Sequence, residues 1–235
     1  MRRIFLITAL VLIGLSKVNA QTQIQNSGWL FLLNSTRLSE KWGLHLDVQV
    51  RSADNWGYVR NLLVRPGITY YINSTNNVTA GYLLATTKTN VVGMADINTN
   101  EHRIWEQYIL SHKLKASFVS HRFRLEQRFI EQTNGDDLFA QRFRYFVRLM
   151  QPLQNKAEKF ENGAFIALQN EVFLNIQHKN LLNKSIFDQN RFYIAAGYRF
   201  SKKIDLEAGY LNQYIKGATT KTSNRVVQLA LYTRF

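Results

Sequence analysis

Hydrophobic and polar residues alternate along most of the chain, in one segment after another. Residues 44–51 are typical, since they read Leu, His, Leu, Asp, Val, Gln, Val and Arg. Because successive side chains of a β-strand point to opposite faces, such a segment forms a strand with one apolar and one polar face. The pattern predicts strands at residues 28–38, 43–52, 58–72, 77–88, 101–113, 118–132, 138–151, 163–176, 187–200, 203–216 and 222–235.

The links between these segments alternate in length. Short turns are expected at residues 39–42, 73–76, 115–117 and 201–203, and longer links at 53–57, 89–100, 133–137, 177–186 and 217–221. Bacterial outer-membrane barrels alternate in this way, with short periplasmic turns and longer outer loops. One link, at residues 152–162, is long and charged although it falls on the short-turn side.

The number of candidate strands is odd, whereas bacterial barrels normally have an even number. An even number would follow if residues 21–26 rise into the wall or the lumen as an additional, atypical segment. A missed strand or one wrong assignment would also remove the conflict. We therefore expect about 10–12 strands and favour an even number.

The first twenty residues have the pattern of a secretory signal peptide. A basic start is followed by an apolar run, residues 4–15, which is too short to cross a bilayer as a helix. Small residues before a cleavage site then end at Ala20. We expect a signal peptide at residues 1–20 and one β-barrel domain at residues 21–235.

The polar faces carry full charges, and this decides which face points inward. In residues 118–132, three arginines and Glu126 alternate with Phe and Leu, and residues 138–151 follow the same pattern. A soluble barrel turns its apolar face inward, whereas a membrane barrel turns it toward lipid and keeps a polar lumen. The sequence thus predicts an all-β fold, a transmembrane antiparallel up-and-down β-barrel. A secreted, soluble, lipocalin-like binding barrel is the second alternative.

Aromatic residues near the strand ends, among them Trp29, Trp42 and Trp56, fit the girdles of a membrane barrel. The last segment ends in Phe235 after alternating apolar residues. This ending resembles the closing strand of outer-membrane barrels, which the barrel assembly machinery recognises in that class. We expect Phe235 to be the assembly signal. The expected location is the outer membrane of a Gram-negative bacterium, with a monomer in contact with membrane lipid and lipopolysaccharide.

The composition of the chain argues against several kinds of functional site. The chain has no cysteine, which excludes disulfides and thiolate metal sites. The net charge is +14, but the arginines alternate within strands and form no exposed basic stripe with stacking aromatics. The charge therefore does not indicate nucleic-acid binding. Nothing in the sequence indicates a cofactor or a metal site.

Several motifs along the chain are distinctive. They are Trp29 together with residues 38–42, then residues 65–70, 80–82, 101–107 and 121–129, of which Glu-His-Arg-Ile-Trp-Glu-Gln at 101–107 is the most characteristic. On these motifs the chain resembles an outer-membrane β-barrel family known only as a domain of unknown function (family 2490). The resemblance implies a barrel in the outer membrane and implies no activity.

The main chemical feature is a ladder of arginines on the polar faces of two neighbouring predicted strands. It consists of Arg122, Arg124, Arg128, Arg142, Arg144 and Arg148, and Arg51, Arg65, Arg191 and Arg199 join it if their strands face as expected. Candidate counter-charges are Asp47, Glu106, Glu126, Glu171, Asp205 and Glu207. Across tight turns, Glu106 is expected opposite Arg124, and Asp205 opposite Arg199.

An unpaired charge inside a barrel is costly, so the ladder is first a candidate for a structural ion-pair network. The excess of arginine over acid also allows an anion-selective pore or a site for an anionic solute. The sequence therefore predicts a structural or small-solute barrel with an arginine-rich lumen and no assigned activity.

A lipid hydrolase, similar to lipid A deacylases or phospholipases, is the first alternative. The best candidates for such a site are His112, Ser120 and His121, near the turn at residues 115–117. A hydrolase needs its nucleophile and base within reach of each other, whereas adjacent residues of a strand point to opposite faces. We therefore expect no enzymatic activity and assign no catalytic residue.

Overall fold

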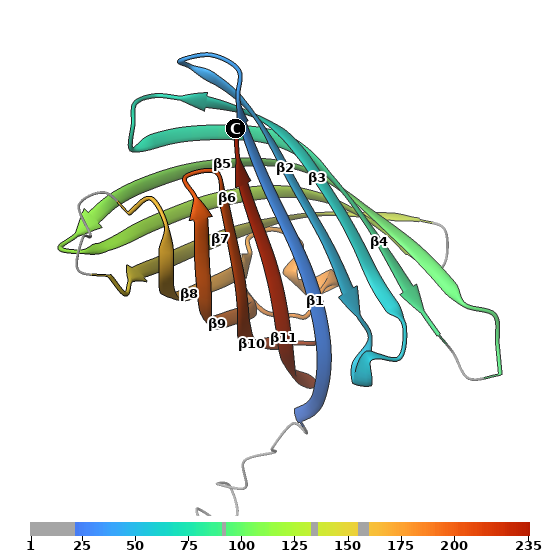
Figure 1. Cartoon of the computed structure of the whole chain (residues 1–235). Helices are drawn as coiled ribbons and strands as arrows, with labels where there is room; N and C mark the ends of the chain where they lie inside the picture. The colour runs from blue at the N-terminus through green and yellow to red at the C-terminus, as the bar shows by residue number, and fades with distance from the viewer. Residues whose placement is uncertain (1–21, 91–92, 133–135, 155–159) are drawn as a thin grey trace, which may run out of the picture.

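The alternating segments form β-strands that close into a barrel (Figure 1). The computed structural model describes residues 22–90, 93–132, 136–154 and 160–235, so the predicted signal peptide at residues 1–20 lies outside the described residues. The strands are β1 (Thr22–Arg37), β2 (Trp42–Ser52), β3 (Val59–Tyr71), β4 (Asn76–Thr89), β5 (Ile97–Leu114), β6 (Ser117–Glu131), β7 (Asp137–Pro152), β8 (Gly163–Asn175), β9 (Phe187–Ser201), β10 (Ile204–Lys216) and β11 (Lys221–Arg234). The all-β barrel of about 10–12 strands is confirmed.

The barrel closes between β1 and β11, which run parallel, from Thr22 opposite Lys221 to Ser35 opposite Arg234. Every other neighbouring pair is consecutive in sequence and antiparallel, as in the pairing of β1 with β2. A closed barrel whose strands alternate in direction must contain one parallel pair when their number is odd. The described residues form an odd-numbered barrel, so the preference for an even number is wrong.

The start of β1 explains why no additional segment makes the number of strands even. The sequence predicts a strand from residue 28 and a separate, atypical segment before it. Instead, the strand begins at Thr22 and is hydrogen-bonded in register with β11 from its first residue. At the other end of this seam, the Phe235 amide donates to the Ser35 carbonyl at 2.9 Å. Phe235 is therefore part of the closure of the barrel.

The links divide between the two ends of the barrel. The short turns after β1, β3, β5 and β9 lie at the end that holds the C-terminus, which we call the turn end (Figure 1). The longer links lie at the opposite loop end and carry two single helical turns, η1 (Asp54–Trp56) and η3 (Lys179–Leu181). The exception is the link between Pro152 of β7 and Gly163 of β8, which is long but lies at the turn end, as the sequence indicated. No helix in the described ranges is long and apolar enough to cross a membrane.

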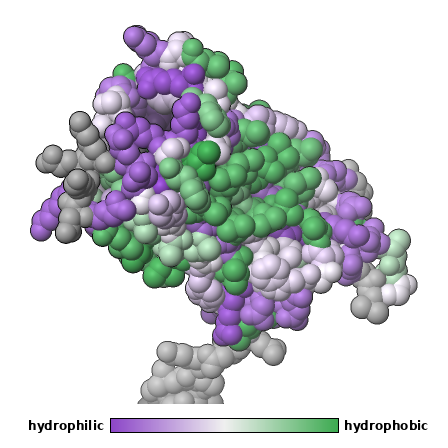
Figure 2. All heavy atoms as spheres, in the orientation of Figure 1, coloured by the Kyte–Doolittle hydropathy of each residue, from purple (hydrophilic) through white to green (hydrophobic). Residues whose placement is uncertain are grey.

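The apolar faces of the strands point outward and the polar faces point inward. Leu30, Ile68 and Val227 are 56%, 58% and 57% exposed, whereas Arg124 and Glu126 are 1% and 0% exposed. Figure 2 shows the resulting apolar band across the barrel wall, with polar atoms above and below it. The structure thus has the facing expected of a membrane-type barrel.

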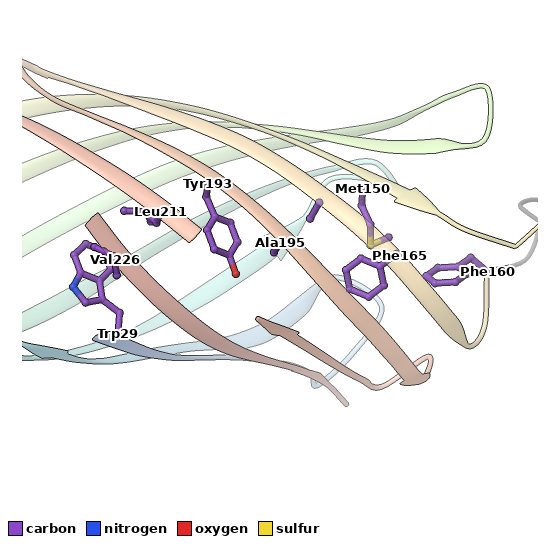
Figure 3. Close-up of a cluster of buried hydrophobic side chains, with 9 residues drawn as sticks. Trp29, Met150, Phe160, Phe165, Tyr193, Ala195, Leu211 and Val226 are labelled. Carbon is purple, nitrogen blue, oxygen red and sulfur yellow. The ribbon is translucent and has the colours of Figure 1, made fainter. Parts of the chain in front are cut away.

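Aromatic rings fill parts of the lumen between the charged residues. One cluster includes Trp29, Phe165 and Tyr193, which Figure 3 shows along one side of the interior. Trp29 is 5% exposed, so its expected place in an outer girdle is wrong. Trp42 does lie outside, where its ring packs edge-on against Tyr70 at 5.0 Å.

Inward glycines make room for these rings. The sequence Ala-Gly-Tyr occurs at residues 80–82, 196–198 and 208–210. A Cβ built at the three glycines would lie 2.6 Å from Trp105, 2.4 Å from Phe165 and 2.7 Å from Tyr193. In each case a ring from a neighbouring strand occupies the space that the missing side chain leaves. The repeat therefore marks places where a large ring lies flat against the inner wall.

Candidate functional site: the arginine-lined lumen

Glu126 on β6 is the centre of the ion-pair network in the lumen. Its carboxylate accepts hydrogen bonds from Nε and Nη2 of Arg142, at 3.0 and 2.6 Å, and from Nη1 of Arg144. Arg142 lies directly across the β6–β7 pair from Glu126. The guanidinium of Arg103 approaches the same carboxylate at 3.7 Å. One fully buried acid thus neutralises parts of three arginines, which suits the planar fork of arginine.

Arg144 connects this centre to a second acid, Glu171 on β8. Its Nε and Nη2 donate to Oε1 of Glu171 at 2.9 and 2.7 Å. Arg122 donates to the same oxygen at 2.8 Å. Two carboxylates and three arginines of the predicted set therefore form one continuous network on β6, β7 and β8.

A third acid, Glu101, extends the network toward the loop end. It accepts two bonds of 2.7 Å from Arg103 and two, of 2.5 and 3.3 Å, from Arg128. Arg142 also donates to Asp188 at 2.9 Å. The sequence analysis missed Glu101, Arg103 and Asp188 as lumen residues. The alternation within residues 101–107 could have placed the first two, because both share the face of Trp105.

Glu106 is not a counter-charge of the lumen, and this prediction is wrong. It is exposed on the outer face, opposite Leu125, and accepts a hydrogen bond of 3.2 Å from Gln127. The turn between β5 and β6 contains only Lys115 and Ala116, and Lys115 adopts a φ of 55°. The expected pairing assumed a tight turn centred on Lys115, whereas the observed turn is centred between Lys115 and Ala116. The shift of one position brings Gln107, and not Glu106, opposite Arg124.

The remaining predicted acids lie inside and are paired. Asp205 faces Arg199 across the β9–β10 turn, as expected, with bonds of 2.7 and 2.9 Å, and it also accepts from Arg234 at 2.7 Å. Glu207 pairs with Arg148, and Asp47 pairs with Arg65. The structure thus brings all six ladder arginines and five of the six predicted acids to the inward face.

Three inward arginines have no carboxylate within ion-pair distance among the described residues: Arg51, Arg124 and Arg191. Each is held by a glutamine and packs over an aromatic ring. Arg124 donates to Gln107 at 3.1 and 2.6 Å and lies 4.6 Å from the Trp105 ring.

Arg51 and Arg191 follow the same arrangement at another ring. Arg51 bonds to Gln49, and Arg191 donates to Gln189 at 3.2 Å. Their guanidinium carbons lie 4.0 and 5.2 Å from the ring centre of Trp29. Cation–π contacts and hydrogen bonds to glutamine side chains position these charges without neutralising them.

The side chains divide the lumen into cavities. A mid-lumen cavity of about 260 Å³ is lined by Trp29, Arg144, Arg191, Glu171 and neighbouring groups. A loop-side cavity of about 270 Å³ includes Trp29 and Arg51. A turn-side cavity of about 610 Å³ is lined by residues such as Arg199 and Asp205.

The residues considered for a hydrolase lie on opposite faces of the wall. Ser120 lines the mid-lumen and turn-side cavities, and its hydroxyl is 3.4 Å from that of Ser111. His112 and His121 stack on each other at 5.3 Å, and Nδ1 of His121 contacts the Tyr145 hydroxyl at 2.9 Å. Ser120 and His112 both line the turn-side cavity, but among the described residues no hydrogen bond joins Ser120 to either histidine. The described residues also contain no group of three or more potential metal ligands.

Comparison with known proteins identifies a family. The sequence model of a family described as "Protein of unknown function (DUF2490)" matches residues 26–224, from β1 into β11. No curated protein and no solved structure matches the chain significantly. The match covers most of the barrel and all the strands that build the ion-pair network.

Proposed function

The chain belongs to the DUF2490 family of unknown function, and we propose that it is an outer-membrane β-barrel with an ion-paired lumen. In this proposal the barrel is a structural or small-solute barrel and not an open diffusion pore. It is a monomer that contacts membrane lipid and lipopolysaccharide. The barrel assembly machinery inserts it, with Phe235 as the signal.

The observation that carries the proposal is the reversal of the usual burial pattern. Large apolar side chains such as Leu30 and Ile68 are exposed, while Arg124, Glu126 and Arg144 are buried. In water this outer surface would be unfavourable, since large exposed apolar patches mark contact with protein or membrane. In a bilayer it is the expected lipid-facing surface. This pattern argues against the alternative of a soluble, lipocalin-like barrel, whose interior would be apolar.

The lumen supports a barrel without a wide channel. Arg142 and Arg144 on β7 pair with acids on the flanking strands β6 and β8 and on β9, and Arg148 on β7 extends past β8 and β9 to Glu207 on β10. Breaking any of these contacts would leave a buried charge uncompensated, which is costly. The network therefore holds the side chains in the interior and leaves separate cavities of a few hundred Å³.

Planar-bilayer recording of the purified, refolded barrel tests this proposal. We expect heat-modifiable, lipid-integrated protein and no stable conductance steps of porin size, because the ion pairs occupy the cross-section. Large, persistent steps would contradict the closed lumen. If those steps prefer anions and the preference disappears in Arg144→Ala, the barrel is an anion-selective pore. Protein that stays soluble without detergent would contradict the membrane location.

Release of acyl chains from vesicles is the corresponding test for the hydrolase alternative. The barrel is incubated with phospholipid and lipopolysaccharide vesicles, and free fatty acid is measured. We expect none above the level of a Ser120→Ala variant. Release that depends on Ser120 would favour the lipid hydrolase, and it would require the wall to rearrange around that residue.

A further inference from the structure

The charges around Trp29 are not balanced by the network described above. Trp29 lines both the mid-lumen and the loop-side cavities and so forms a partition between them. Arg51 lines the loop-side cavity, and Arg191 lines the mid-lumen cavity. Both guanidinium groups contact the indole ring, at 4.0 and 5.2 Å. An aromatic partition therefore carries one uncompensated cation on each side.

The acids nearest to these arginines are already occupied. Glu171 is the register partner of Arg191 across the β8–β9 pair, but its Oε1 accepts from both Arg122 and Arg144. Asp47, on the same strand as Arg51, is paired with Arg65 and accepts from Gln49 at 2.9 Å. Each acid thus already pairs with one or two other arginines, and among the described residues neither forms an ion pair with Arg51 or Arg191.

The lining of the mid-lumen cavity contains more arginines than carboxylates. It contains the arginines 65, 122, 144, 148, 191 and 234, and the carboxylates of Asp47 and Glu171. Glu126, Glu207 and Asp205 pair with Arg144, Arg148 and Arg234 from outside this lining, which leaves Arg191 as the one of these six without a carboxylate partner among the described residues. The amides of Gln49, Gln169 and Gln228 also line it. A space of this size that presents several guanidinium groups and neutral donors suits a multivalent oxyanion better than a cation or an apolar molecule.

We propose that the mid-lumen cavity binds a small multivalent oxyanion of the phosphate class, with Arg191 as its principal ligand. Arg51, on the loop side of Trp29, attracts the anion toward this partition. The cavity of about 260 Å³ limits the ligand to a small molecule. The inference rests on the proposed function only in placing this lumen inside a membrane barrel.

The chemistry selects Arg191 because, of the arginines that line this cavity, it is the one without a carboxylate partner among the described residues. Arg122, Arg144 and Arg148 each hold a carboxylate, so an anion near them competes with an existing bond. Arg191 gives only one bond, from Nε to Gln189, and packs over Phe173 at 4.6 Å. Its two terminal nitrogens can bind two oxygens of a phosphate without breaking an ion pair.

Binding of inorganic phosphate to the refolded barrel in detergent tests the site. The unfolding midpoint and calorimetric Kd are measured against chloride at equal ionic strength, since a ligand that binds only the folded state raises its stability. We expect phosphate to stabilise the wild type. The Arg191→Gln variant should bind it at least about tenfold more weakly, the loss of one charge-assisted interaction. Arg51→Gln should slow association more than it weakens affinity.

Arg225→Gln is the matched control, because Arg225 is an exposed arginine on the outer face of β11. It should bind phosphate as the wild type does. Equal binding by wild type and Arg191→Gln, or no binding beyond chloride, would overturn the site. Membrane integration is scored separately by flotation with vesicles. A barrel that floats but ignores phosphate contradicts this inference alone, whereas one that binds phosphate but does not float contradicts the membrane proposal.

Discussion

Replacing Glu126 with alanine is expected to destabilise the folded barrel by about 3–5 kcal/mol, the cost of leaving buried partners of an ion pair uncompensated. Glu126 is fully buried and accepts from both Arg142 and Arg144, while Arg103 lies 3.7 Å away. Its removal leaves three guanidinium groups in a confined interior with fewer acids. The change in the free energy of unfolding is measured by urea titration of the barrel in lipid vesicles, followed by tryptophan fluorescence.

Glu106→Ala is the matched control for this experiment. Glu106 and Glu126 lie on neighbouring strands, but Glu106 is exposed on the outer face and has one neutral partner, Gln127. Its loss should change stability by no more than about 0.5 kcal/mol, as for a surface substitution. Equal effects of the two substitutions would show that the inward network does not hold the barrel together.

Gly81→Ala is expected to cost about 3 kcal/mol, at the upper end of the range for an overpacked interior. A Cβ at this position would lie 2.3 Å from the Pro66 carbonyl oxygen, 2.6 Å from the Trp105 ring and 2.8 Å from the Gly67 Cα. Two of these atoms belong to the backbone, so rotation of one side chain cannot relieve the overlap. We expect a lower urea midpoint together with a shifted Trp105 emission.

Gly57→Ala serves as the comparison. Gly57 lies in the loop after η1, has an ordinary φ of −59°, and a Cβ there would meet only the Asp54 carbonyl oxygen, at 3.6 Å. Stability should change by less than about 0.5 kcal/mol. If Gly81→Ala is equally mild, the close contact between Trp105 and the inner wall is not what requires glycine.

The strands could be predicted from the sequence because their alternation is strong and local. Residues 44–51 place their aliphatic side chains outward and their polar ones inward, as the pattern requires. The start of β1 was harder to predict, because residues 22–27 are almost entirely polar and their partner is the last strand of the chain. A pairing between the two ends of a sequence leaves no local signal, so the parallel seam could not be foreseen.

The composition of the lumen could be predicted, but its pairing could not. The faces of Arg122, Arg144 and Arg148 follow from alternation alone. The partner of each depends on register, and register across a hairpin changes by one residue with the length of the turn. At the turn of Lys115 and Ala116, this difference of one residue pairs Gln107 with Arg124 on the inner face. Glu106 therefore lies opposite Leu125 on the outer face. Contacts such as Arg142 with Asp188 join residues that are not on adjacent strands, and no pattern in the sequence reports them.

The parallel seam also fixes where a circularly permuted version of this barrel could be joined. Thr22 and Phe235 lie at opposite rims, whereas a barrel with an even number of strands brings both ends to the same rim. A short peptide therefore cannot bridge them. The bridge would have to run the full height of the wall beside β11, which has 14 residues, and would need about that many extended residues of its own.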